Sequence, residues 1–568
     1  MSLEKKSQEL KEIVSTYETE WFLGDLSGLM MNIASGRAQD QLGKLSSPIR
    51  QLYFLGGLLI TSDDKDGTDI QYSPEKWNEI VRLLNEIEVE YSKLFFPRKD
   101  KKIDEEWKKI RKVAMPSFLS YFNQGPLNYE EQSISWISEL YTELDDIIDT
   151  KTGLKTIDFL NFYEDLDALH QQNFQSFSPK GELKKNWKEY TKIEMVNTAP
   201  PELGFTPPES TWAMYHYMAD QGMINRFYPK ELVSENLPIE KVEKILALLS
   251  CERAKSNFLY YTSTKPGNPL YEKPIIKAEK GLFQVFEVKQ VLHSIENLLE
   301  TICSTNKADI TKLTKRKGDL LESKIVTIFS KFLGKDFTVY RSYNIDDCEQ
   351  DILILWKNLA FIIEAKGYNL REPLRDPNRA FVRIKDDFKN CIGYGYEQTM
   401  RVESKFLEGK PFKIYDKNGN TIGEINPDNY GDDFYSIIVN LKSFGQIQND
   451  LSTLLEIGED DVYPWVIKLD DLEVFLLTLI KKKKTPKYFA NYLLFREELH
   501  GKLVCSDELE VCGGYLINKL NEKIVDKFDT IVTTPDLPEV FDEQYRKEIG
   551  FDNEKYLKEK RSGKYIFW

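Results

Sequence analysis

The spacing of apolar residues changes near residue 307, and this change limits the folds open to the chain more than any other feature. Before it, residues 1 to about 195 follow helical spacing almost without interruption. In 73–95, Pro74 suits a first helical position, and Ile80, Leu84 and Ile87 fall on one face. No run in this part alternates as a strand would, so we expect an all-helical domain there.

After residue 307 the sequence predicts strands and helices in mixed order. Apolar runs of strand length lie between two segments of helical spacing, and Asn418-Gly419 marks the turn of a hairpin. The predicted helices are 318–334 and 388–407, and the predicted strands are 336–345, 350–356, 358–367, 435–441 and 464–469. This order indicates an α/β domain with a central mixed sheet.

The length of the chain and its proline-rich joints suggest three segments. The chain has 568 residues, enough for several domains. Prolines at 200, 201, 207 and 208 form a joint, and a second joint precedes the pattern change. We therefore expect an all-helical domain at 1–195, a helical extension and connector at 196–306, and an α/β domain with C-terminal helices at 307–568.

The composition narrows the class of protein. Lys and Arg number 77 against 92 Asp and Glu, a formal net charge of −15, so no overall positive field draws the chain to nucleic acid and any such contact must be local. The six cysteines show no metal-binding spacing. No secretory signal or run long enough to span a bilayer is present, so we expect a cytoplasmic protein with no membrane partner.

Three chemically distinctive residues lie on two of the predicted strands. Glu364 and Lys366 are two positions apart at the end of an apolar run, so they share one face of a strand. A hairpin turning at Lys357-Asn358 would bring Asp351, which opens the preceding strand, close to Glu364. Two such carboxylates suit a hard cation, Mg²⁺ or Mn²⁺, with water and substrate phosphate as further ligands.

A fourth candidate, Glu322, lies on the helix before these strands. Ile325, Val326 and Phe329 follow it at helical spacing, which places its carboxylate on the inward face. A buried carboxylate needs a partner. That partner is a metal ion, a lysine in a buried salt bridge, or a set of hydrogen-bond donors, and the metal ion held by Asp351 and Glu364 is the one we expect.

This arrangement resembles the PD-(D/E)XK nuclease superfamily, whose core has an acid on a first helix, an Asp on a strand, and (D/E)-x-K on the next strand. The resemblance covers about 310–445 and departs in one detail, because Gln350 rather than proline precedes Asp351. It implies a restriction-endonuclease-like fold, with Asp351 and Glu364 as metal ligands assisted by Glu322. Lys366 would orient the attacking water and stabilise the charge that develops on phosphorus.

Basic residues flank these positions and are candidate contacts for nucleic acid. One group precedes Glu322 and another follows Lys366, and each is either a phosphate-binding rim or a solvated surface. The candidates are Lys315, Arg316, Lys317, Arg375, Arg379 and Arg383. Gln398, on the next helix, is either a polar neighbour of the site or an ordinary surface residue.

The sequence therefore predicts a Mg²⁺-dependent endonuclease, with DNA favoured over RNA as its nucleic-acid partner. Metal and lysine can activate water without histidine, and the four histidines neighbour no obvious nucleophile. We expect the acidic helical half to regulate the nuclease through a homo-oligomer or a protein partner, as in bacterial antiviral defence effectors. The alternatives are an inactive nuclease-like scaffold that binds nucleic acid or protein, and a phosphatase acting on small molecules.

Overall fold

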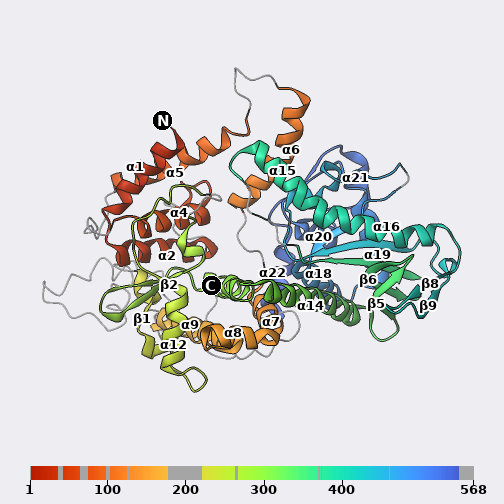
Figure 1. The fold of residues 1–568 in the computed structure, drawn as a ribbon. Helices are drawn as coiled ribbons and strands as arrows, with labels where there is room; N and C mark the ends of the chain where they lie inside the picture. The colour runs from red at the N-terminus through yellow and green to blue at the C-terminus, as the bar shows by residue number, and fades with distance from the viewer. Residues whose placement is uncertain are drawn as a thin grey trace, which may run out of the picture. The chain divides into compact units, whose positions relative to one another are not determined.

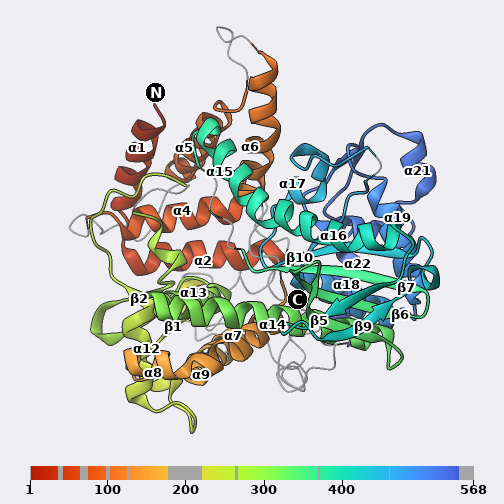
Figure 2. The same cartoon turned by 45° about the vertical axis from the view of Figure 1, so that its right-hand side comes forward.

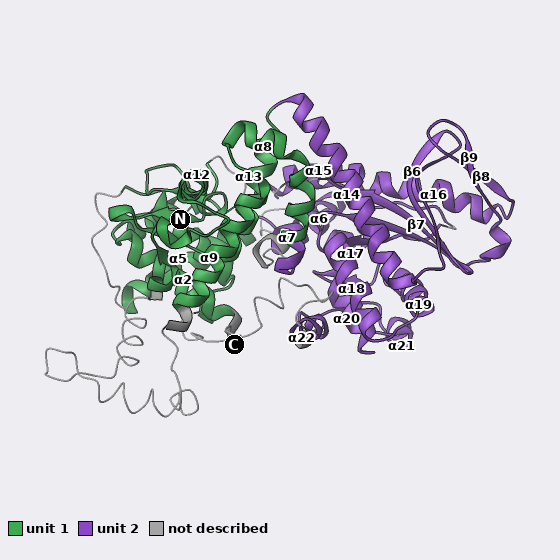
Figure 3. Cartoon of the chain, turned by 90° about the horizontal axis from the view of Figure 1, so that it is seen from below, with its two compact units in different colours: residues 1–93, 133–305, 562–568 green, residues 94–132, 306–561 purple. Residues whose placement is uncertain are grey.

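The structure is a computed structural model that describes residues 2–35, 42–63, 74–96, 103–123, 128–176, 221–261, 266–368, 371, 374–459 and 461–548. These residues form two compact units (Figure 3). The first holds the described residues of 1–93 and 133–305, and the second holds those of 94–132 and 306–561. The segment 94–132, which we had placed in the N-terminal helical domain, therefore groups with the second unit. The predicted boundary at residue 195 lies outside the described residues.

The first unit is mainly helical, as the spacing of its apolar residues predicted. Helix α5 begins at Pro74, and Ile80, Leu84 and Ile87 are completely buried. The other helices are α1 (Leu3–Ser15), α2 (Thr19–Ser35), α4 (Pro48–Ile60), α7 (Glu130–Tyr141), α8 (Asp145–Thr152), α9 (Thr156–Ser176), α12 (Ile239–Leu249) and α13 (Val288–Ile302), and α5 spans Pro74–Ser92.

A small sheet in the first unit was not expected from the sequence. Its strand order is β1-β4-β3-β2. The strands are β1 (Arg226–Phe227), β2 (Ser250–Cys251), β3 (Ile275–Lys277) and β4 (Phe283–Val285). Strands of two or three residues are too short to show alternation of apolar and polar residues, so the sequence contains no sign of them.

The second unit contains the predicted mixed sheet, with seven strands in the order β11-β10-β7-β6-β5-β8-β9 (Figures 1 and 2). β10 runs parallel to both β7 and β11, and the remaining neighbours are antiparallel. The strands are β5 (Thr338–Ile345), β6 (Cys348–Trp356), β7 (Leu359–Lys366), β8 (Phe412–Tyr415), β9 (Thr421–Ile425), β10 (Phe434–Asn440) and β11 (Trp465–Lys468). A separate parallel pair is formed by β12 (Leu503–Val504) and β13 (Ile531–Val532).

Helices pack on this sheet and extend beyond it. They are α6 (Glu105–Asn123), α14 (Lys307–Leu333), α15 (Pro377–Phe388), α16 (Tyr394–Leu407), α17 (Gln446–Asn449), α18 (Leu469–Lys481), α19 (Pro486–Glu497), α20 (Glu508–Leu516), α21 (Glu522–Lys527) and α22 (Glu539–Glu548). A single π-helical turn, Lys389–Gly393, joins α15 to α16. Among the residues described, no helix is both long enough and apolar enough to cross a membrane.

β6 and β7 form the centre of the sheet and are buried on both faces. Phe361 contacts Phe329 of α14 on one side, whereas Ile362 packs with Val402 and Phe406 of α16 on the other. This double burial explains why both strands read as continuous apolar runs. The two strands pair as the predicted hairpin, with Trp356 opposite Leu359.

Candidate active site

The open ends of the β6–β7 hairpin bring Asp351, Glu364 and Lys366 together. The Asp351 amide donates a hydrogen bond to Glu364 Oε1 at 3.2 Å, and the Ala365 amide donates to Asp351 Oδ2 at 2.8 Å. Lys366 Nζ lies 2.8 Å from Glu364 Oε2 and 3.5 Å from Asp351 Oδ2. The three side chains therefore form one hydrogen-bonded cluster, in the place where the hairpin register puts them.

Glu364 is the most deeply buried member of this cluster, with a side chain that is 1% exposed. Burial raises its pKa to about 8, although the Lys366 ammonium acts in the opposite direction; the neighbouring Asp351 carboxylate adds to the rise. The surroundings of Glu364 therefore disfavour its charged form, and additional positive charge nearby would stabilise that form.

Lys366 is held by side chains that come from α16. Its Nζ donates to Gln398 Oε1 at 2.6 Å and lies 5.4 Å from the centre of the Tyr394 ring. Burial acts to lower the pKa of Lys366, but the carboxylates of Glu364 and Asp351 outweigh it and raise that pKa. Lys366 is therefore a fixed, charged ammonium at the end of β7.

Gly395 makes room for this lysine. A Cβ atom at Gly395 would lie 3.1 Å from Lys366 Cε and 3.1 Å from Ile438 Cδ1, closer than side chains normally approach. The sequence patterns did not identify either Gly395 or Tyr394 as part of the site. Their only signal is a glycine beside an aromatic residue on a predicted helix, and such pairs are common on helices that line no site.

Glu322 lies at the edge of the cluster rather than within it. Its Oε2 accepts a 3.4 Å hydrogen bond from Ser342 Oγ and is 3.7 Å from Arg341 Nη2. Burial raises the pKa of Glu322 to about 7, and the nearby Asp351 carboxylate contributes to the rise. The charge of Asp351 therefore affects the ionisation of Glu322. The basic residue near Glu322 is Arg341, not the lysine considered from the sequence.

The oxygen-rich cluster suits a hard cation with few protein ligands. Within the described ranges, no three His, Cys, Asp or Glu side chains are grouped closely enough to hold a metal ion by themselves. Mg²⁺ is commonly held by one or two carboxylates, with waters and substrate phosphate completing its shell. Asp351 and Glu364 match that donor set, and the raised pKa of Glu364 is what an added cation would relieve.

A buried hydroxyl that the described residues leave without a partner lies beside these carboxylates. The Tyr343 side chain is completely buried, and among the described residues its hydroxyl has no hydrogen-bond partner. Burial raises its pKa, and the charges of Glu364 and Asp351 add to that rise. An unpartnered buried hydroxyl next to two carboxylates is a suitable partner for a water molecule.

The candidate nucleic-acid contacts fall in three places. Lys315, Arg316 and Lys317 lie on α14 before Glu322, where Lys315 is exposed and Lys317 is buried. Arg375 precedes α15, and Arg379 and Arg383 lie on it. Gln398 is 6% exposed and bonded to Lys366, so it is a neighbour of the site and not a surface residue.

Comparisons with protein-family models, with curated proteins and with solved structures find no match to this chain.

Proposed function

We propose that the second unit is a metal-dependent nuclease of the restriction-endonuclease-like class, which hydrolyses phosphodiester bonds of nucleic acid with DNA favoured over RNA. One observation carries the proposal: the buried Glu364 contacts both Asp351 and Lys366 at the open end of a central hairpin. The order of α14, β5, β6, β7 and α16 around this cluster agrees with the resemblance drawn from the sequence.

Asp351 and Glu364 would hold Mg²⁺ or Mn²⁺, with Glu322 beside them. When bound, the ion would supply positive charge for the phosphate oxygens and acidity for the attacking water. The two carboxylates differ in exposure, since the side chain of Asp351 is 21% exposed and that of Glu364 is 1% exposed. Asp351 is therefore the carboxylate that solvent and substrate reach first.

Lys366 would stabilise the negative charge that develops on the phosphate. An ammonium has three donors, and two of them are used by Glu364 and Gln398. The third makes no such short hydrogen bond among the described residues and is available to a phosphate oxygen or a water. A fixed donor in a site of low dielectric stabilises such charge more strongly than a mobile one in water.

Glu322 would exchange a proton with water at the edge of the cluster. Its pKa of about 7 gives comparable amounts of acid and base near neutral pH, which is the range in which proton transfer is most effective. Ser342 and Arg341 hold the carboxylate in position.

The test is cleavage by the full-length chain of supercoiled plasmid, linear duplex, single-stranded DNA and RNA, with Mg²⁺, Mn²⁺ or EDTA. We expect metal-dependent cleavage that falls at least about 100-fold in Asp351→Asn and Lys366→Met, since positioned acid–base and charged groups contribute on that scale. The matched control is Glu349→Gln, because Glu349 lies two positions from Asp351 on β6 but is exposed and paired with Lys417. Cleavage that survives in Asp351→Asn would refute the assignment.

A specific observation favours the alternative of an inactive scaffold. Lys366 already provides positive charge to Glu364 and Asp351, as it would in a purely structural ion network. A scaffold would bind nucleic acid or protein, cleave none of the four substrates, and lose stability in Lys366→Met. The regulatory role of the helical region, through a homo-oligomer or a protein partner, stays a prediction.

A further inference from the structure

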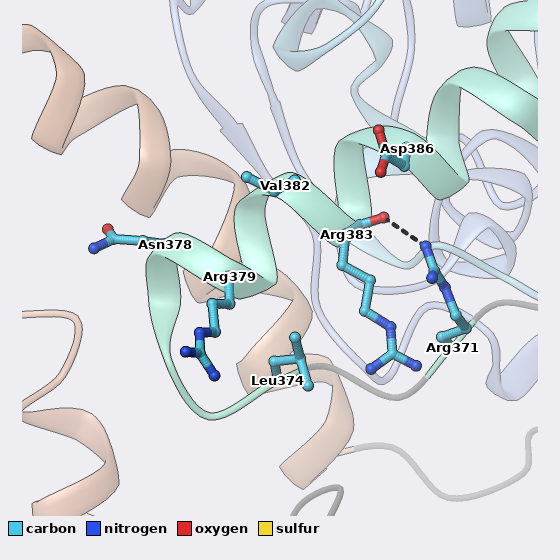
Figure 4. Close-up of a pocket in the computed structure, with 7 residues that line it drawn as sticks. All are labelled: Arg371, Leu374, Asn378, Arg379, Val382, Arg383 and Asp386. Carbon is cyan, nitrogen blue, oxygen red and sulfur yellow. Dashed lines mark hydrogen bonds between the residues drawn. The ribbon is translucent and has the colours of Figure 1, made fainter.

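An open hollow beside α15 is lined by arginines. Its volume is about 620 Å³, within the range of ligand pockets. Arg371, Arg379 and Arg383 contribute to its wall, and Leu374 and Val382 supply apolar surface (Figure 4). The guanidinium groups of Arg379 and Arg383 extend to the same side of α15 as Leu374. The hollow therefore presents positive charge on a partly apolar floor.

Two of these arginines carry charge that the surrounding protein does not neutralise. Arg371 is paired with Asp387, its Nε lying 2.8 Å from Asp387 Oδ1. Within the described residues, Arg379 and Arg383 form no ion pair, and the buried Nε of Arg383 has no hydrogen-bond partner. Asp386 is the one acidic residue of the wall. Two free guanidinium groups against one carboxylate leave the hollow net positive.

Arginine, rather than lysine, at both free positions indicates the kind of anion. A guanidinium is a planar fork of donors that matches two oxygens of one phosphate, and it loses less hydration than an ammonium when it binds. A phosphate group with apolar atoms attached would use both the arginines and the Leu374–Val382 surface. A nucleic-acid backbone has this composition.

Contacts along one side of the α15–α16 segment connect the hollow to the carboxylates. At the α16 end of this segment, Gln398 and Tyr394 contact Lys366. On α15, Asp387 Oδ1 accepts a 3.0 Å hydrogen bond from the hydroxyl of Tyr368, which is two residues after Lys366 in the sequence.

Beside the hollow, Arg371 binds Asp387 and also donates a hydrogen bond to the Arg383 carbonyl at 3.5 Å. Tyr368 and Arg371, which follow β7 in the sequence, thus both contact Asp387 on this helical segment. Both ends of this path belong to the second unit.

The length of the helical segment sets the separation of the two places. Arg383 and Tyr394 are 11 residues apart on a segment that is α-helical except for the turn Lys389–Gly393, so they are separated by at most about 16 Å along its axis. Neighbouring phosphates of one strand advance by about 3.4 Å along the helix axis and lie farther apart along the strand itself, so a separation of this size spans several nucleotides at most. A single mononucleotide is too short to occupy both places at once.

We propose that the arginine hollow binds a backbone phosphate of the same nucleic acid, a few nucleotides away from the bond that is cleaved. The proposal rests on the nuclease function above and adds a substrate class to it: a polymer long enough to reach both places. The hollow contributes binding and positioning, while the chemistry occurs at Asp351, Glu364 and Lys366.

The test compares Arg379→Gln/Arg383→Gln with the wild type on two duplexes in Mg²⁺: a short duplex of four base pairs closed by a hairpin loop, and a 20-base-pair duplex. For the long duplex we expect KM to rise about tenfold. We also expect the slope of log KM against log salt concentration to fall by about one to two, because one or two phosphate contacts are lost. For the short duplex we expect no change. The matched control, Lys482→Gln/Lys523→Gln, removes the same charge from two exposed lysines and should behave as the wild type.

Equal KM values of the wild type and the arginine variant on the long duplex would overturn the proposal, as would equal losses on both lengths. If the wild type cleaves neither duplex, the nuclease assignment fails separately, and fluorescence anisotropy of the 20-base-pair duplex in EDTA then tests the hollow. In that assay, binding about tenfold weaker in the arginine variant supports the hollow, and unchanged binding overturns it.

Discussion

Replacing Glu364 by Gln changes the way in which stability depends on pH. The substitution keeps the shape of the side chain and removes its charge. In the folded protein the pKa of Glu364 is about 8, against an ordinary value of 4.5, because the carboxyl group is buried. The unfolded chain therefore releases this proton first, so Glu364 makes the folded state progressively less stable as pH rises from 4.5 to 8.

The size of this effect follows from the two pKa values. Each pH unit between them corresponds to 1.36 kcal/mol, so the unfavourable contribution is about 1 kcal/mol at pH 5 and about 3 kcal/mol at pH 7. The Glu364→Gln variant lacks this unfavourable contribution to stability. The variant should therefore gain about 2 kcal/mol relative to the wild type between pH 5 and pH 7, while Glu322 titrates in both proteins and cancels from the comparison.

Urea unfolding at pH 5, 6 and 7 in EDTA measures this difference, with hydrogen exchange of peptides from β6 and β7 as the probe of the second unit. Glu349→Gln is the control, because that carboxylate is exposed and its removal should leave the pH dependence unchanged. A difference between wild type and Glu364→Gln that stays constant within about 0.5 kcal/mol from pH 5 to pH 7 refutes the reasoning, since Glu364 would then ionise as an ordinary exposed carboxylate.

Four further predictions concern the same unit. A Mg²⁺ concentration of 100 times the wild-type Kd at pH 7 should stabilise the wild type by about 2–3 kcal/mol at that pH. The same concentration should stabilise it less at pH 5, and should stabilise Glu364→Gln less, because the ion competes with a proton; equal shifts in unfolding midpoint at both pH values would contradict this. Arg496→Met should cost about 3–5 kcal/mol in urea unfolding, since it leaves Glu508 buried without its 2.8 Å partner, and Glu508→Gln in the same chain should recover part of the loss. Gly395→Ala should lower cleavage about tenfold by displacing the neighbouring lysine. Gly318→Ala, where a methyl group meets open space on α14, should add up to about 1 kcal/mol of stability with activity unchanged.

The centre of the candidate site could be predicted from the sequence because its information is local. Two apolar runs joined by a two-residue turn fix the hairpin, and the period of a strand fixes the shared face of Glu364 and Lys366. Asp351 then follows from counting residues back from the turn. These three positions needed no knowledge of distant contacts.

The surroundings of that centre could not be predicted because they depend on packing between distant segments. Nothing local to Tyr394 or Gly395 shows that α16 lies beside Lys366, and nothing local to α6 shows that it groups with the second unit. Nothing in the residues around Arg371 shows that the fold pairs it with Asp387 and leaves Arg379 and Arg383 without such a partner among the described residues. Long-range partner choice is set by the whole core, so patterns within one segment do not contain it.

The π-helical turn between α15 and α16 sets the angular relation of the two helices. A π-helical turn takes one more residue than an α-helical turn, and each residue of an α-helix advances about 100° around the axis. Deleting one residue within Lys389–Gly393 would restore a regular α-helix and rotate α15 by about 100° relative to α16. The side chains of α15 that now line the arginine hollow would then point elsewhere, although every one of them would still be present.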